Sequence, residues 1–209
     1  MEINLLGNHF TLSDQKAVFW HEKKYILLAD LHLSKETHFR KHGIAVPAGI
    51  TTSILKMLEN LLQTFQPVEI YFLGDLFHSD ENKGVEEFYE WRKNQKQQFN
   101  LIAGNHDVMH IDVYDRLLIN RCGTQFLIDE FILSHAPIED GKINFCGHLH
   151  PSVTMFGKAR QSLRLPCFFH RNNNFILPAF GKFTGSHSIK QNETDKIYAI
   201  AENKVIQVH

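Results

Sequence analysis

Cysteine is scarce in this sequence. Three cysteines occur among 209 residues, and none of them lies in a Cys-x-x-Cys pair. An odd, scattered set of cysteines argues against a disulfide framework and fits a reducing compartment. We therefore expect a cytoplasmic protein.

Long apolar runs and an excess of charge are also missing. No apolar run reaches the roughly eighteen residues that a helix needs to cross a bilayer. The first residues, MEINLLGNHFTLSD, lack the basic start and long apolar stretch of a signal peptide. We expect no contact with a membrane. The formal net charge is −1 with histidines counted as neutral, which argues against broad electrostatic binding of nucleic acid.

Histidine, by contrast, is abundant, with 14 residues in the chain. Such an excess points to metal binding or to proton transfer. The chain length suits one domain, which we expect to span residues 1–209.

Short apolar segments alternate with amphipathic ones, which predicts an α/β (α+β) fold. Helices are expected at 49–65, where apolar residues recur at helical spacing, and at 84–97. From about residue 153 the chain is richer in strand signals, and we expect a second sheet there. The strands expected before that point are 16–20, 24–30, 68–73, 99–103, 130–134 and 142–146.

Five of these strands each end in a short polar cluster that contains an acid, a histidine or an asparagine. The carboxyl ends of strands line the ligand crevice of open α/β sheets, so we expect the clusters to converge. In chain order they are Asp30-Leu31-His32, Gly74-Asp75, Gly104-Asn105-His106-Asp107, Ser134-His135 and Gly147-His148-Leu149-His150.

The residue types in the clusters indicate a metal site. Carboxylates, imidazoles and an amide oxygen suit divalent ions such as Mn²⁺, Fe²⁺, Zn²⁺ or Ni²⁺, and the lack of cysteine argues against a thiolate zinc site. Side chains two apart on an extended segment point the same way, so Asp30 and His32 can reach one ion, and His148 and His150 repeat that spacing. The two oxygens of Asp75 can bridge two ions. Glycines precede three clusters, where a tight turn or a close backbone approach is needed.

Each cluster taken alone has an ordinary structural interpretation. Gly-Asp is a common turn, and one histidine at a strand end is more often a satisfied polar residue than a ligand. Gly-Asn-His-Asp and Gly-His-x-His are much rarer. All five clusters in this order, each after an apolar strand, favour the metal site.

The order D-x-H, G-D, G-N-H-D, H and G-H-x-H resembles the calcineurin-like metallophosphoesterases over about residues 25–150. The stretches LLADLHLSKETHFRKHGIAVP, GDLFHS, LRLPCFF and ILPAFGKFTG extend the likeness over nearly the full chain, to the bacterial ligase-associated DNA damage response endonucleases of the PdeM group. Where that group commonly has glycine after D-L-H-L, this chain has Ser34. The resemblance implies a four-layer β-sandwich of two mixed sheets flanked by helices.

The resemblance also implies which residues hold two divalent ions. Mn²⁺ is the expected metal, with Fe²⁺, Zn²⁺ and Ni²⁺ as alternatives. Asp75 bridges the ions. The remaining ligands are Asp30, His32 and His150 for one ion and Asn105, His135 and His148 for the other.

Other residues are implied to act on the substrate. His106 stabilises the transition state or protonates the leaving oxygen, and Asp107 orients its imidazole. His78 is a weaker candidate for substrate contact. Arg40 is another, in a basic stretch over residues 35–42 that has a solvated charged segment as an equal interpretation.

We therefore expect a dinuclear metal-dependent phosphoesterase that hydrolyses phosphodiester bonds. DNA as the substrate, a link to DNA repair, and DNA ligase or helicase partners are implied by the resemblance alone. A phosphatase or phosphodiesterase for a small nucleotide-like phosphoester is the alternative, which the near-neutral charge favours. A non-catalytic scaffold is a third hypothesis, against which the complete ligand set and His106 argue. The oligomeric state stays open.

Overall fold

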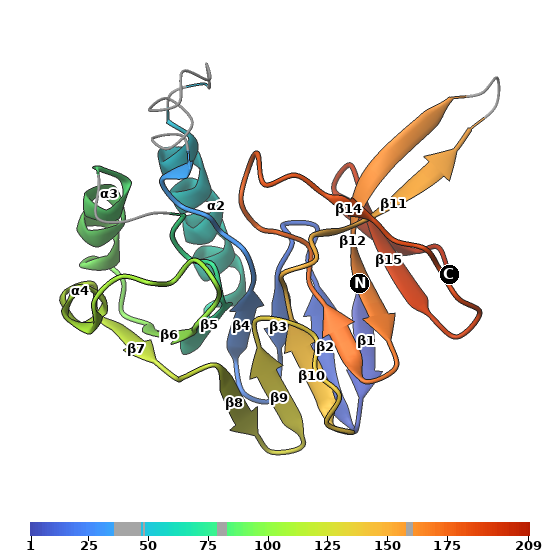
Figure 1. Ribbon diagram of the computed structural model, residues 1–209, viewed down its shortest axis with the longest axis horizontal. Coiled ribbons are helices and arrows are strands. Elements are labelled where there is room, and N and C mark those ends of the chain that lie inside the picture. Colours follow the sequence, from blue (N-terminus) through green and yellow to red (C-terminus); the bar gives the residue numbers. More distant parts are fainter. Residues whose placement is uncertain (36–46, 48, 79–82, 158–160) are drawn as a thin grey trace.

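The computed structural model describes residues 1–35, 47, 49–78, 83–157 and 161–209. These residues form two β-sheets, with the helices on one side of the molecule (Figure 1). The seven-stranded sheet contains β1 (Glu2–Leu5), β2 (Asn8–Leu12), β3 (Val18–Trp20), β4 (Tyr25–Leu28), β5 (Glu69–Leu73), β6 (Gln98–Ile102) and β7 (Ile119–Arg121). The nine-stranded sheet contains β8 (Gln125–Ile128), β9 (Phe131–Ser134), β10 (Ile143–Cys146), β11 (Pro151–Phe156), β12 (Ser162–Arg171), β13 (Asn174–Ile176), β14 (His187–Ser188), β15 (Lys196–Ala201) and β16 (Lys204–Gln207). The helices are α2 (Ile50–Phe65), α3 (Lys83–Arg92) and α4 (Ile111–Arg116).

Both sheets are mixed, as expected. In the first sheet, β1 to β4 pair antiparallel and β4 to β7 pair parallel. In the second sheet, β9, β10 and β13 form a parallel core, with β8 and β12 antiparallel beside it. Parallel strands bring their carboxyl ends to one edge. The five polar clusters follow β4, β5, β6, β9 and β10, so each sheet presents its clusters along one edge.

Alternate side chains of β4 enter two different cores. Ile26 and Leu28 pack with the helices, whereas Leu27 packs against the second sheet, together with Ala29 just beyond the strand. The strand is therefore buried on both faces, which explains its unbroken apolar sequence. Full burial of each large aliphatic side chain contributes about 1.5–3 kcal/mol.

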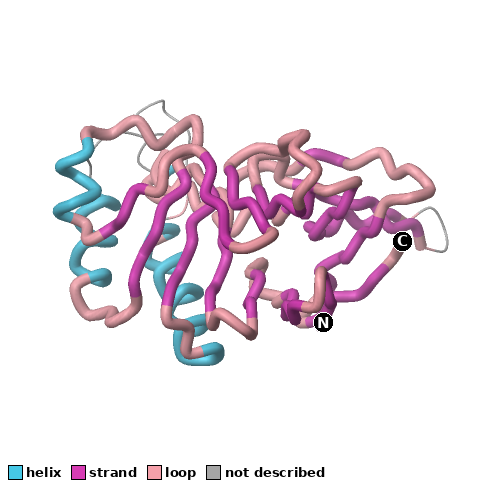
Figure 2. The backbone as a smooth tube through the Cα atoms, turned by 90° about the horizontal axis from the view of Figure 1, so that it is seen from below, coloured by secondary structure: helices cyan, strands magenta, loops and turns pink. Residues whose placement is uncertain are grey.

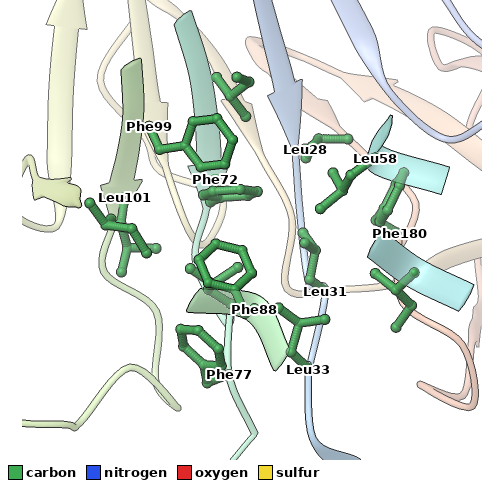
Figure 3. Packing of buried hydrophobic residues seen from close by; sticks show 14 of the residues in the cluster. Leu28, Leu31, Leu33, Leu58, Phe72, Phe77, Phe88, Phe99, Leu101 and Phe180 are labelled. Atoms are coloured by element: carbon green, nitrogen blue, oxygen red, sulfur yellow. The ribbon is translucent and has the colours of Figure 1, made fainter. Parts of the chain in front are cut away.

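The core between the first sheet and the helices is rich in aromatic rings (Figure 3). Phe72 of β5 and Phe99 of β6 meet edge to face, with ring centroids 5.7 Å apart. Phe88 of α3 meets Phe77 edge to face at 5.4 Å. Phe77 lies two residues after Asp75, so this core anchors the loop that carries that carboxylate.

Helix α2 confirms the helix expected at 49–65. Its buried residues, among them Ile54 and Leu58, recur at helical spacing and face the first core. The helix ends because Gln66 adopts a left-handed conformation, with its N–H on the carbonyl oxygen of Leu62. Pro67 follows and cannot continue a helix. No helix among the described residues is long and apolar enough to cross a membrane.

Helix α3 ends at Arg92, before the end at 97 that we expected. The buried Arg92 guanidinium donates to the carbonyl oxygens of Gln95, Gln97 and Leu118. The chain must turn after Arg92 for these carbonyl groups to reach it. The contact of Arg92 with Leu118 therefore accompanies the end of α3, although the sequence pattern remains helical beyond residue 92.

All three described helices contribute to the core on the outer face of the first sheet (Figure 2). The outer face of the second sheet carries a smaller apolar cluster around Cys167, Phe169 and Ile197. Within the described ranges no helix covers that cluster. Among the described residues, the layers are thus the helices, the first sheet and the second sheet.

Candidate metal centre

The polar clusters after β4, β5, β9 and β10 meet in one place. Ligand-type atoms of Asp30, His32 and His150 lie within 4.8 Å of one another, and so do those of Asp30, Asp75 and His135. The first group is the set that the resemblance implies for one ion. Because Asp30 belongs to both groups, the structure outlines two adjoining positions.

Asp75 lies between imidazoles from two different loops. Its Oδ2 is 3.8 Å from Nε2 of His32 and 3.5 Å from Nε2 of His135. Its Oδ1 accepts the backbone N–H of His106 at 2.9 Å. One oxygen is thus held by the loop after β6 while the other faces both histidines, which is the placement that a bridging ligand needs.

Asp30 is fully buried, and one of its oxygens points into the centre. Its Oδ2 accepts the backbone N–H of His148 at 2.8 Å. Its Oδ1 has no hydrogen-bond partner among the described residues and lies 3.5 Å from Nε2 of His150. A buried carboxylate oxygen without a donor is costly, so this atom has an open position for a cation.

Backbone carbonyl groups orient two of the imidazoles. Nδ1 of His135 lies 3.0 Å from the carbonyl oxygen of Leu73, and Nδ1 of His150 lies 3.1 Å from that of Thr184. A ring nitrogen that faces a carbonyl oxygen must carry the proton, which leaves each Nε2 as a lone-pair donor. Nε2 of His135 also lies 3.1 Å from Nδ1 of His148. The rings of His135 and His148 therefore present nitrogens from neighbouring strands to one point.

The surroundings shift the pKa values of His32 and His150 in opposite directions. Burial, reinforced by the charge of Lys35 and by nearby imidazoles, lowers the pKa of His32 to about 2. His32 is therefore neutral, the form that binds metal. Burial disfavours protonated His150, but the neighbouring Asp30 carboxylate and the carbonyl group of Thr184 outweigh it and raise the pKa of His150. The position beside Asp30 thus favours a positive charge.

Left-handed backbone conformations concentrate on the expected ligands. Such conformations in non-glycine residues cost about 1–3 kcal/mol each and persist where the surrounding structure imposes them. Hydrogen bonds between the first two ligand loops hold these residues in place: Asp30 N–H donates to Gly74 O at 3.2 Å, and His32 N–H donates to Asp75 O at 2.9 Å. Five of the seven expected ligands have positive φ: Asp30 (54°), His32 (46°), Asp75 (51°), His148 (69°) and His150 (47°).

The glycines that precede the ligands lie where no side chain fits, as expected. A Cβ on Gly74 would collide with the ring of His135, and Gly74 has a φ of +81°. A Cβ on Gly147 would collide with Oδ2 of Asp30 and with Ala29. Strands of the two sheets thus approach each other at the centre through glycine backbone.

His106 and His78 lie beside the centre rather than within it. The ring centroid of His106 is 5.4 Å from that of His32 and 5.0 Å from that of His78. Ligand-type nitrogens of these three histidines lie within 4.8 Å of one another. His106 and Asn105 are both exposed in the loop after β6, and Arg40 lies outside the described residues.

Asp107 makes contacts that were not expected. Its Oδ2 accepts the backbone N–H groups of Asp75 at 2.7 Å and of Gly104 at 2.9 Å, and its Oδ1 accepts that of Leu76 at 3.0 Å. None of the described hydrogen bonds joins it to the imidazole of His106. Asp107 thus ties the loop after β6 to the loop after β5, and the orientation of His106 by Asp107 stays a prediction.

The centre includes a sixth loop that the strand-end clusters did not predict. Residues 177–186 follow β13, and Thr184 in this loop supplies the carbonyl group that orients His150. Gly181 N–H donates to the carbonyl oxygen of Asp30 at 3.1 Å. The loop has no acid or histidine, so ligand chemistry gave no signal for it, although ILPAFGKFTG was part of the family likeness.

The donors fit divalent cations. Asp30 and Asp75 place two buried carboxylates side by side, and burial of two negative charges costs several kcal/mol unless cations neutralise them. Imidazole nitrogens of His32, His135 and His150 surround the pair. Carboxylate and imidazole together suit borderline divalent ions.

Comparison with known proteins adds a family and a full-length structural relative. A family model described as Calcineurin-like phosphoesterase matches residues 23–173, which include all five clusters. None of the curated proteins matches the chain. The crystal structure of the nuclease MPE of Pseudomonas putida is similar over 100% of this chain and 99% of that one, with 29% identity and a TM-score of 0.85.

Two more distant structures are also similar in part. A protein of unknown function from Aquifex aeolicus is 22% identical, with a TM-score of 0.40 over 56% of this chain and 62% of that one. The phosphoesterase Yfce from E. coli is 18% identical, with a TM-score of 0.45 over 88% of this chain and 97% of that one.

Proposed function

The chain belongs to the calcineurin-like phosphoesterase family, and we propose that it is a dinuclear metal-dependent phosphodiesterase that cleaves DNA. The observation that carries the proposal is the meeting of Asp30, His32 and His150 with Asp75 and His135 in two adjoining ligand groups. The similarity of the whole chain to a nuclease supports a polynucleotide substrate. A role in DNA repair with ligase or helicase partners remains an extension of the family likeness.

Seven side chains are proposed to hold two divalent ions, with Mn²⁺ the first choice. When bound, such a pair supplies Lewis-acid stabilisation of phosphoryl oxygens and a lowered pKa for water. Asp75 is proposed to lie between the two ions. The other six ligands are Asp30, His32, His150, Asn105, His135 and His148.

His106 is proposed to act on the leaving oxygen. Its backbone N–H is fixed on Asp75 while its imidazole is exposed beside His32 and His78. An exposed imidazole beside the proposed ligands supports the role of a proton donor to the leaving oxygen. His78, beside it, is proposed to contact the substrate from the same side.

Lys35 is proposed to balance the charge of the scissile phosphate. It is half-buried, and burial lowers its pKa while the charge of Asp75 partly restores it. The same ammonium group helps to lower the pKa of His32. A cation whose charge acts on two proposed ligands is suited to pair with a phosphoryl oxygen.

A substrate panel with Mn²⁺ tests the function. We expect hydrolysis of bis-p-nitrophenyl phosphate and cleavage of DNA, assayed on single- and double-stranded oligonucleotides. Asp75→Asn is the control for contaminating nuclease, since loss of the bridging carboxylate is expected to remove most activity on every substrate.

Two outcomes would change the assignment. Hydrolysis of bis-p-nitrophenyl phosphate without cleavage of either DNA would replace DNA by a small nucleotide-like phosphoester. Hydrolysis of the monoester p-nitrophenyl phosphate alone would refute phosphodiesterase activity.

A further inference from the structure

A basic cleft of about 400 Å³ is lined in part by the loop of residues 177–186, the loop that also contacts the metal centre. It lies between three segments: the turn joining β2 to β3, which carries Lys16; strand β12, which carries Arg164; and the loop of residues 177–186, which carries Lys182 and Phe183. Arg164 is paired in register with Thr154 of β11. These two strands form the hairpin that projects from the body of the molecule (Figure 1).

The cleft and the metal centre share one loop. Gly181 donates its N–H to the carbonyl oxygen of Asp30, and the Thr184 carbonyl oxygen orients His150. Lys182 and Phe183 lie between these two anchor points. Gly181 and Thr184, which contact two of the expected ligands, thus also line the cleft.

The described lining of the cleft carries three positive charges. Lys16, Arg164 and Lys182 line it, and no acidic residue is found among the described residues of its lining. None of the three forms an ion pair with a carboxylate in the described part of the chain. Burial and the charge of Lys182 lower the pKa of Lys16, so these two cations repel each other. The chain as a whole has a net charge of −1, so this density is a local feature.

Phe183 adds an aromatic surface to the same cleft. Its side chain is 54% exposed, and its φ is +60°. An exposed ring on a residue in a left-handed conformation costs free energy in two ways, through hydration of apolar surface and through backbone strain. Aromatic rings beside cations are the features with which proteins bind nucleic-acid strands, because rings stack on bases and cations pair with phosphates.

We propose that this cleft, defined by Lys16, Arg164, Lys182 and Phe183, binds the polynucleotide strand next to the bond that is cut. The cations pair with backbone phosphates that flank the scissile one, and Phe183 stacks on a base. The proposal rests on the proposed function, since it assigns the residues that select a polynucleotide over a small diester. It also explains how a chain without an overall basic charge retains a nucleic acid.

Competition for the centre provides the test. The Mn²⁺-loaded protein hydrolyses bis-p-nitrophenyl phosphate in the presence of an oligonucleotide of about 16 nucleotides, within the range that one binding groove covers. The inhibition constant of the oligonucleotide is measured for wild type, Arg164→Ala and Lys182→Ala, both exposed positions, at several salt concentrations. Lys96→Ala, an exposed lysine after α3, is the charge-matched control.

We expect each cleft variant to raise the inhibition constant about tenfold, the usual scale for removal of a charge-assisted hydrogen bond. The slope of log affinity against log salt should fall by about 0.7 for each backbone phosphate that the variant no longer neutralises. Hydrolysis of bis-p-nitrophenyl phosphate alone should match wild type, and Lys96→Ala should match wild type in every respect. Phe183→Ala should weaken a normal oligonucleotide more than one that lacks the stacked base, with no change in salt slope.

The outcomes separate the cleft from the proposed function. If wild type cuts the oligonucleotide and the cleft variants match Lys96→Ala, the cleft assignment fails alone. If the oligonucleotide inhibits through the cleft residues but is never cut, the cleft stands and the DNA-cleaving function fails. If it neither inhibits wild type nor is cut, both fail.

Discussion

The carboxylate of Asp107 accepts the backbone N–H of Asp75 at 2.7 Å. The same side chain accepts the N–H groups of Gly104 and Leu76. Three backbone donors on one buried carboxylate fix the two loops relative to each other, although burial still raises the pKa of Asp107 overall. The residue next to His106 in sequence therefore holds the loop of the proposed bridging ligand.

This relationship predicts that Asp107→Ala weakens metal binding. Removal of the carboxylate frees the N–H groups that position Asp75, and residues that orient a metal ligand commonly contribute about 10–100-fold to metal affinity. Activity should therefore recover in excess Mn²⁺. Metal affinity is measured by calorimetric titration, and activity with bis-p-nitrophenyl phosphate. Unchanged affinity with an altered pH–rate profile would instead support a direct action of Asp107 on His106.

His106→Ala should slow turnover while leaving the metals in place. Loss of a general acid reduces the rate by about 10²–10⁴-fold, and the ligand groups around Asp30 do not depend on the His106 ring. Metal content is measured by inductively coupled plasma mass spectrometry, alongside kcat. His110→Ala, which removes an exposed histidine on the same segment, is the matched control. Loss of bound metal from His106→Ala would contradict the assigned role.

Gly147→Ala should destabilise the protein because the new Cβ collides with Asp30 and Ala29. Overpacking of this kind costs about 1–3 kcal/mol, and urea unfolding measures the free energy of unfolding. Gly157→Ala is the matched control, because its nearest neighbouring atom would lie at 3.6 Å, an ordinary contact. Equal stability of the two variants would show that the strands do not approach as closely as the structure places them.

Stabilisation by Mn²⁺ should grow as the pH rises. Metal binding requires neutral imidazole, and the raised pKa of His150 means that its proton competes to a higher pH than in a free histidine. Below the ordinary value of 6.5 the metal must displace that proton, so the increase in Tm should be small there and larger above it. At about 100 times Kd the expected stabilisation is about 2.7 kcal/mol.

Thermal unfolding with and without Mn²⁺, from acid to mildly alkaline pH, measures this dependence. Asp30→Ala should abolish the metal-induced shift. A shift that is largest at low pH would contradict the competition between proton and metal. His32 should contribute nothing to the dependence, since its pKa of about 2 keeps it neutral throughout.

Local sequence patterns predicted those elements whose stability is local or whose burial is complete. Helix α2 was predictable because its apolar residues recur at helical spacing before Pro67. The parallel strands were predictable because burial on both faces requires unbroken apolar runs. The end of α3 was not, because carbonyl groups from later in the chain, including that of Leu118, bind Arg92. The short helix α4 and the strand β14 were also missed, since so few residues carry little periodic signal.

The donors and their order follow from the amino-acid sequence alone: seven side chains of ligand type, each just after an apolar strand, and a histidine beside them. Donor chemistry and strand periodicity are local properties, so the sequence reveals them directly. Which groups share a position depends instead on how two sheets meet through Gly74 and Gly147, and this required the folded structure. Only the structure shows that the Asp107 carboxylate binds the backbone N–H of Asp75. Only the structure shows that the loop of residues 177–186 lies at the centre. Those contacts join segments far apart in the chain, and no spacing rule encodes them.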